Sequence, residues 1–192
     1  LSMRESMMTT SQLRADIRRD PLTGVGNRRA LAEWTDRDRF AALMIDLDRF
    51  KSVNDELGHH AGDSGLRLVA EVIGSQIRSH ALLVRYGGDE FLLLLDGADT
   101  GVAEAVAGRI RASVAALDGA GLSPSGRITV SIGVASGSGP VDDAIARADV
   151  ALYEAKAAGR DAVAVAADAP AGLCPQPRTA LGDESLDTPV VE

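Results

Sequence analysis

The chain has 192 residues, of which 45% are hydrophobic and 25% charged, and its formal net charge is -8 at pH 7. A chain of this length and apolar content can enclose one sizeable core, so a single domain is expected. The acidic balance argues against a nucleic-acid partner, because it repels a phosphate backbone. Any ligand rich in phosphate would have to bind through local cations and a bridging metal ion.

The two ends of the chain differ from its middle. Residues 1–19 are polar, with Leu13 and Ile17 at helical spacing, and predict a linker or signalling helix. Residues 167–192 hold five acids, one arginine and four of the seven prolines, which predicts a disordered acidic tail. The solitary cysteine, Cys174, excludes an internal disulfide. No apolar run approaches the roughly 20 residues of a membrane helix, and no secretory signal precedes residues 20–166, so a cytoplasmic domain is expected.

Hydrophobic periodicity between these ends predicts an α+β fold with a mostly antiparallel sheet covered by helices. The strand over 40–46 and a hairpin over 81–95 are expected to lie centrally. The expected helices are 28–34, 49–57, 62–79, 102–117 and 141–158, and the expected strands are 40–46, 81–84, 91–95, 128–135 and 162–166.

The strand over 40–46 runs into a polar segment that contains Asp46 and Asp48. If the chain stays extended, the two carboxylates share a face, and their oxygens suit Mg²⁺ or Mn²⁺. Asp48 has a second possible role, because it directly precedes Arg49 and could cap the next helix. We favour the cap for Asp48 and the metal for Asp46. On that helix, Lys51 and Asn54 share a face that suits phosphate and a base edge, or is simply solvated.

Gly87-Gly88 lies between two apolar runs and predicts a two-residue hairpin turn in which glycine takes positive φ. Asp89 and Glu90 then begin the second strand and point to opposite faces. A hard cation would stabilise both acids; a hairpin with solvated acids explains this segment equally well. Further along, Lys156 and Arg160 stand where phosphate could be bound, although the helix dipole and Gly159 as a terminating residue also account for them.

Six segments occur in an order and spacing that resemble the GGDEF domain family, whose active members are diguanylate cyclases that condense two GTP into cyclic di-GMP. The resemblance spans roughly residues 18 to 166 and implies a palm-like fold. The segments are 20–29 (Asp-Pro-Leu-Thr-Gly-Val-Gly-Asn-Arg-Arg), 46–55, 58–63, 85–91 (Arg-Tyr-Gly-Gly-Asp-Glu-Phe), 129–134 and 148–160.

The resemblance also implies a role for each matching residue. Asp46 and Asp89 would bind Mg²⁺, with Mn²⁺ possible, through their side chains and Leu47 through its carbonyl, and Glu90 would assist. Asp89 would also accept the proton of the attacking hydroxyl. The residues implied to hold GTP are Lys51, Lys156 and Arg160 for the phosphates, Asn54 and Asp63 for the guanine edge, and His59 for the pocket wall. From its neighbours alone, Asp63 would be a helix cap.

Each such domain offers one GTP pocket, so the family implies catalysis by a homodimer of half-sites, driven by an upstream sensor domain. The family's inhibitory site for product is an Arg-x-x-Asp segment, whereas residues 78–81 here read Arg-Ser-His-Ala. Arg78 and Arg85 therefore form a degenerate site, and weak or absent product inhibition is expected. The rival functions are a catalytically silent GTP-binding or regulatory domain and, in a related class, an adenylyl or guanylyl cyclase.

Overall fold

The computed structural model describes residues 17–34, 37–77 and 80–167. The predicted N-terminal helix, the acidic tail and Arg78 fall largely or wholly outside these residues. The elements in chain order are η1 (Arg28–Glu33, a 3-10 helix), β1 (Arg37–Leu47), α2 (Phe50–Leu57), α3 (His59–Ser75), β2 (Ala81–Arg85), β3 (Glu90–Asp96), α4 (Thr100–Ala115), β4 (Val130–Gly139), α5 (Val141–Ala157) and β5 (Val163–Val165).

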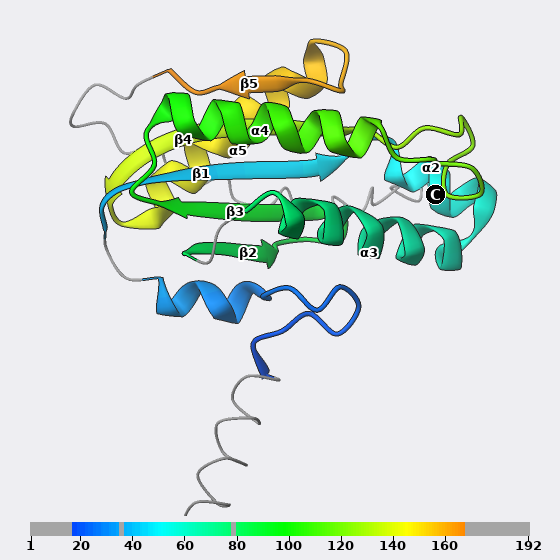
Figure 1. Ribbon diagram of the computed structural model, residues 1–192, viewed down its shortest axis with the longest axis horizontal. Helices are drawn as coiled ribbons and strands as arrows, with labels where there is room; N and C mark the ends of the chain where they lie inside the picture. Colours follow the sequence, from blue (N-terminus) through cyan, green and yellow to red (C-terminus); the bar gives the residue numbers. More distant parts are fainter. Residues whose placement is uncertain (1–16, 35–36, 78–79, 168–192) are drawn as a thin grey trace, which may run out of the picture.

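The described strands form one sheet in the order β2-β3-β1-β4-β5 (Figure 1). Neighbouring strands are antiparallel except β4 and β5, which are parallel, so the predicted mostly antiparallel sheet is confirmed. β1 is the central strand, as expected. Only one strand of the hairpin, β3, lies inside the sheet. β3 pairs with β1 on one side and with β2 on the other, so β2 is an edge strand.

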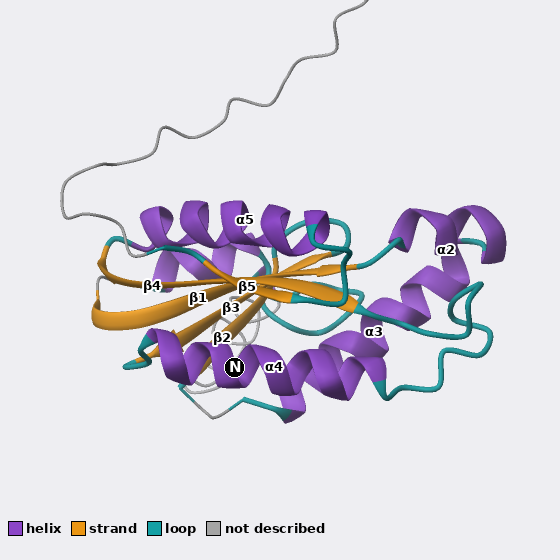
Figure 2. Ribbon diagram, turned by 90° about the horizontal axis from the view of Figure 1, so that it is seen from above, coloured by secondary structure: helices purple, strands orange, loops and turns teal. Residues whose placement is uncertain are grey.

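Helices cover both faces of the sheet, with α5 on one side and α3 and α4 on the other (Figure 2). Leu43 and Ile45 of β1 pack in the cluster of α3 and α4, whereas Ala42 and Met44 pack in the cluster of α5 and η1. Because both faces are covered, residues 40–47 are buried without interruption. This explains why the strand appears in the sequence as a continuous apolar run and not as an alternating one.

Several boundaries differ from those expected. α3 begins at His59 and ends at Ser75, whereas 62–79 was predicted, and residues 28–33 form a 3-10 helix. β4 extends to Gly139 because it pairs along almost the whole length of β1. No helix within residues 17–34, 37–77 and 80–167 is long and apolar enough to cross a membrane.

Gly133 of β4 brings α5 into direct contact with the sheet. A Cβ at this position would overlap the backbone carbonyl oxygen of Ala148 and the backbone of Leu152, both in α5. Backbone atoms of a packed helix cannot move aside as a flexible side chain can. The distance between α5 and β4 therefore depends on a residue without a side chain.

We expect Gly133→Ala to lower the free energy of unfolding by about 3 kcal/mol or more, because α5 must shift off the sheet. Gly74→Ala is the matched control: Gly74 is exposed in α3, and a Cβ there meets nothing within 4 Å. It should raise stability by about 0.5 to 1 kcal/mol through helix propensity. Urea unfolding of both variants checks the pair, and equal effects would contradict the account of Gly133.

Candidate active site

Asp46, the hairpin acids and Lys156 come from elements that meet at one end of the sheet, where β1 ends, β3 begins and α5 ends (Figure 1). The antiparallel register pairs Asp46 of β1 with Glu90 of β3. The backbone N–H of Leu47 donates to the carbonyl of Asp89 at 3.2 Å. The structure therefore brings Asp46 and the acids of the hairpin together although they lie more than forty positions apart in the chain.

Asp46 is a buried acid that pairs with a lysine. Its residue is 6% exposed, and Oδ2 lies 2.7 Å from Nζ of Lys156 in α5. Burial raises the pKa of Asp46 to about 6, and the nearby Asp89 and Glu90 add to the rise, while Lys156 opposes it. Desolvation thus affects the pKa of Asp46 more than the attraction of the Lys156 ammonium does. The ionised carboxylate therefore lowers the stability of the folded protein.

Glu90 belongs to the same acidic cluster. Burial raises its pKa, and repulsion from Asp89 and Asp149 acts in the same direction against the attraction of Lys156 and Arg28. A bound cation would relieve this repulsion.

The hairpin turn differs from the predicted one. Residues 86–89 connect β2 to β3, and neither Gly87 nor Gly88 has a left-handed backbone. The N–H groups of Tyr86 and Gly87 both donate to the carbonyl of Glu90, at 2.8 and 3.2 Å. A Cβ on Gly87 would lie 2.5 Å from Oε2 of Glu90. The glycine thus leaves space for the Glu90 carboxylate, and it does not serve the positive φ that was expected.

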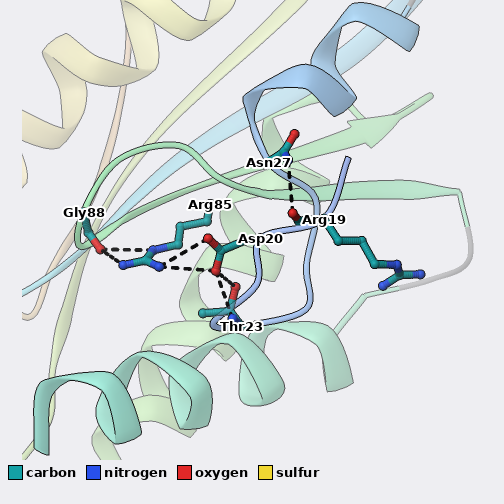
Figure 3. Close-up of polar contacts among 6 residues, drawn as sticks. All are labelled: Arg19, Asp20, Thr23, Asn27, Arg85 and Gly88. Carbon is teal, nitrogen blue, oxygen red and sulfur yellow. Dashed lines mark hydrogen bonds and ion pairs between the residues drawn. The ribbon is translucent and has the colours of Figure 1, made fainter. Parts of the chain in front are cut away.

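An ion pair fixes the turn from outside (Figure 3). Arg85 donates to the carbonyl of Gly88 from Nη2 at 2.7 Å and from Nε at 3.1 Å, and its Nη1 lies 3.2 Å from Oδ1 of Asp20. Burial alone would raise the pKa of Asp20, but hydrogen bonds from Thr23 and Arg85 outweigh it and hold the pKa below its ordinary value. The Arg85 guanidinium, which the sequence placed in a degenerate product site, is thus committed to Asp20 and the turn.

Arg28 makes a second attachment, which sequence reasoning missed. Its Nε donates to the carbonyl of Tyr86 at 2.8 Å, and its guanidinium lies 4.2 Å from the centre of the Tyr86 ring. The sequence contains one indication of the Arg85 and Arg28 contacts. Residues 20–29 and 85–91 both belong to the six segments that resemble the GGDEF family.

The predicted base-reading residues come from α2 and α3. The side chain of Asn54 lies against Gly62, where a Cβ would overlap its Oδ1, and Asp63 follows on the same helix. Asp63 does not cap α3, because the helix begins at His59 with Gly58 as its N-cap. Lys51 and His59 are exposed. Guanine reading by these residues stays a prediction.

Asp48 does not cap α2, which corrects the role favoured above. The N-cap position is Arg49, which has φ 57° and makes no side-chain capping bond. The strand ends at Leu47, so Asp46 and Asp48 do not share an extended face. The Asp48 carboxylate instead accepts hydrogen bonds from Thr129, Ser131 and the backbone of Asp161.

A family model described as "Diguanylate cyclase, GGDEF domain" matches residues 17–162. The chain belongs to the GGDEF domain family. It is 38% identical over 173 residues to the diguanylate cyclase DgcM of Escherichia coli, which covers 84% of this chain and 42% of DgcM. It thus spans less than half the length of this curated relative.

Solved GGDEF structures agree with the fold. The coiled coil and GGDEF domain of DgcB from Caulobacter crescentus, in complex with c-di-GMP, matches with a TM-score of 0.76 and 31% identity, over 85% of this chain and 93% of that one. The diguanylate cyclase SiaD from Pseudomonas aeruginosa, in complex with its activator SiaC, matches with a TM-score of 0.71 and 35% identity, over 85% of this chain and 68% of that one.

The donor set of this GGDEF domain suits a hard divalent cation. Asp46, Asp89, Glu90 and the Leu47 carbonyl offer only oxygen, and the buried Asp46 and half-buried Glu90 carry repulsion that a cation would relieve. In the part of the chain that the structure describes, no three acidic, histidine or cysteine side chains form a ready metal cluster. Mg²⁺ typically takes one or two carboxylates together with phosphate oxygens and waters, so the residues fit an ion that arrives with a nucleotide.

Replacing Asp46 should stabilise the metal-free domain at high pH. The folded pKa is raised from 3.8 to about 6, so the carboxylate destabilises the fold above pH 6, and this cost disappears as the pH falls toward 4. We expect Asp46→Asn to raise the free energy of unfolding by about 1 to 3 kcal/mol at pH 8 and by less at pH 5. Urea unfolding in the presence of a chelator at both pH values measures this.

Asp38→Asn controls for the loss of one negative charge, because Asp38 is exposed at the opposite end of β1. Asp38→Asn should change the free energy of unfolding only slightly, and by a similar amount at pH 8 and pH 5. An Asp46→Asn variant that is less stable than the wild type at pH 8 would show that the Lys156 pair outweighs desolvation.

Proposed function

We propose that this chain is a diguanylate cyclase that converts two GTP into cyclic di-GMP and two pyrophosphates. The supporting observation is the pairing of Asp46 with Glu90 at an intact Gly-Gly-Asp-Glu-Phe turn. The two acids come from neighbouring strands. In the described part of the chain, the only cation bonded to either acid is Lys156, which pairs with Asp46. Relatives of the same family carry the name diguanylate cyclase, which agrees with the proposal.

The substrate would lie across the end of the sheet. Asn54 and Asp63 are a donor and acceptor set that would complement the guanine edge. Asn54 lies against Gly62, the residue that precedes Asp63 in α3. His59, at the start of α3, would border the base. The phosphates would meet Lys51, Lys156 and Arg160, with Lys156 exchanging the Asp46 carboxylate for a phosphate oxygen when GTP binds.

The chemistry is attack by the 3′-hydroxyl of one GTP on the α-phosphorus of the other, with pyrophosphate leaving, performed twice. Mg²⁺ or Mn²⁺ held by Asp46, Asp89, Glu90 and the Leu47 carbonyl would neutralise the phosphates and acidify the hydroxyl. Asp89 would accept the hydroxyl proton, and Glu90 would assist from the adjacent position. Arg85, Asp20 and Arg28 would hold the turn that carries both acids.

Two copies must meet face to face, because one domain supplies one GTP pocket and the product joins two nucleotides. The active species would therefore be a homodimer of half-sites, brought together by an upstream sensor domain. Product inhibition should be weak, since Ala81 stands at the start of β2 where the inhibitory segment requires a carboxylate. An initial rate that falls when cyclic di-GMP is added would contradict this last point.

Incubation with GTP and Mg²⁺, followed by mass spectrometry of the product, tests the reaction. We expect cyclic di-GMP, and we expect Asp89→Ala and Asp46→Ala each to lower turnover by at least about a hundredfold while circular dichroism shows the fold retained. Asp142→Ala, in the first turn of α5, is the matched control and should keep full turnover. A cyclic mononucleotide would indicate the other cyclase class, and GTP binding without product would indicate a silent domain.

Turnover per chain should fall steeply on dilution, because a half-site cannot close the product ring alone. Light scattering and activity measured over the same range of protein concentration check this. Turnover that stays flat while the dimer dissociates would refute the half-site arrangement.

A further inference from the structure

Left-handed residues other than glycine lie close to Asp48. Among the described residues, three that are not glycine have positive φ: Arg49 at 57°, Arg160 at 67° and Asp161 at 46°. Arg49 directly follows Asp48, and the backbone N–H of Asp161 donates to the Asp48 carboxylate. Each such residue costs on the order of 1 kcal/mol, so surrounding contacts must hold it in place.

The end of α5 explains only the first step of this turn. The N–H of Gly159 bonds to the carbonyl of Lys156, and the N–H of Arg160 bonds to the carbonyl of Ala155, which is the usual helix ending at a left-handed glycine. Gly159 accepts this conformation, with φ 121°. The next two residues have side chains and yet remain left-handed, and helix termination does not require that.

The Asp48 carboxylate holds the second half of the turn. Oδ2 accepts from the Thr129 hydroxyl at 2.7 Å and from the Asp161 N–H at 3.0 Å, and Oδ1 accepts from the Ser131 hydroxyl at 2.7 Å. Ser131 is completely buried in β4. The carboxylate therefore joins the end of β1, the start of β4 and the turn after α5.

A second contact holds Asp161 from α4. Nη1 of Arg111 donates to Oδ1 of Asp161 at 2.9 Å and to its carbonyl at 3.2 Å. Both side chains of this pair are about one third exposed, so it contributes little by itself. The Asp48 carboxylate accepts three hydrogen bonds, one of them from the buried Ser131, and is therefore the stronger restraint on the turn.

We propose that Asp48 is a positioning residue that fixes the left-handed turn 159–161 and so places Arg160 for phosphate binding. This inference rests on the proposed cyclase function. Among the described residues, two side-chain contacts connect the segment at the end of β1 to the segment at the end of α5: Asp46 to Lys156, and Asp48 to the backbone N–H of Asp161. The first must open if Lys156 turns to phosphate. The second involves no group to which the proposed function assigns a contact with substrate or metal, so it can keep Arg160 in place throughout.

A double-mutant cycle on GTP affinity in the presence of Mg²⁺ tests this coupling. We expect Asp48→Ala and Arg160→Ala each to weaken GTP binding about tenfold, and the double variant to bind no more weakly than the weaker single variant. Asp48→Asn should keep most of the affinity, because its amide can still accept from the Asp161 N–H and pair with the hydroxyls. An additive cycle would overturn the proposal. If Asp48→Asn binds GTP as weakly as Asp48→Ala, the proposal is also overturned, because the charge and not the hydrogen bonds would then be required.

Hydrogen exchange of the Asp161 amide gives a readout that needs no nucleotide. We expect protection in the wild type, at least a tenfold loss of protection in Asp48→Ala, and no loss in Asp99→Ala. Asp99 is the control because it caps the start of α4 through Val102, at the opposite end of that helix from Arg111, so its removal destabilises the protein away from the turn. Retained protection in Asp48→Ala would refute this inference alone, whereas a wild-type chain that binds no GTP would refute the proposed function.

Discussion

The antiparallel pairing of β1 with β3 is the constraint on which the site depends. It runs without a break from Phe40 opposite Asp96 to Asp46 opposite Glu90. A shift of one residue would turn every side chain of β1 to the other face and would bury Asp46 among the apolar residues of α3 and α4. The apolar runs on both strands thus fix the register, and the register places the acids. The core and the candidate active site share this single determinant.

Unfavourable electrostatic interactions are found at the end of the sheet where Asp46 pairs with Glu90. Two acids with raised pKa values lie beside each other, and one lysine only partly compensates them. Two contacts hold the nearby backbone in place. The Arg85–Asp20 ion pair fixes the hairpin turn, and the Asp48 carboxylate accepts from the backbone N–H of Asp161 in the turn after α5. A domain selected only for stability would replace the buried carboxylate with an apolar residue. A polar site kept at such a cost, with its surroundings fixed in advance, is the arrangement expected where a cation and phosphates bind.

The strands and the main helices could be predicted from the sequence, because apolar runs and glycine-rich turns are local signals. The meeting of Asp46 with the hairpin was expected from the central placement of both strands and from the family resemblance. The details that failed depend on distant partners. Asp48 was expected to cap α2, but its hydrogen-bond donors lie 81, 83 and 113 positions away, and no local pattern reveals them. Gly87 was expected to supply positive φ, and its use as space for the Glu90 carboxylate depends on side-chain packing. Likewise, Lys156 could be assigned to the helix dipole or to phosphate from its position, but not to Asp46.

Binding of Mn²⁺, followed by electron paramagnetic resonance, tests the central claim most directly, that Asp46 and the hairpin acids share one divalent ion beside a purine triphosphate. The titration uses 3′-deoxy-GTP, which lacks the attacking hydroxyl and keeps the complex unreacted. The account predicts an immobilised Mn²⁺ signal in the wild type that weakens at least about tenfold in both Asp46→Ala and Asp89→Ala. Undiminished Mn²⁺ affinity in Asp46→Ala would contradict it.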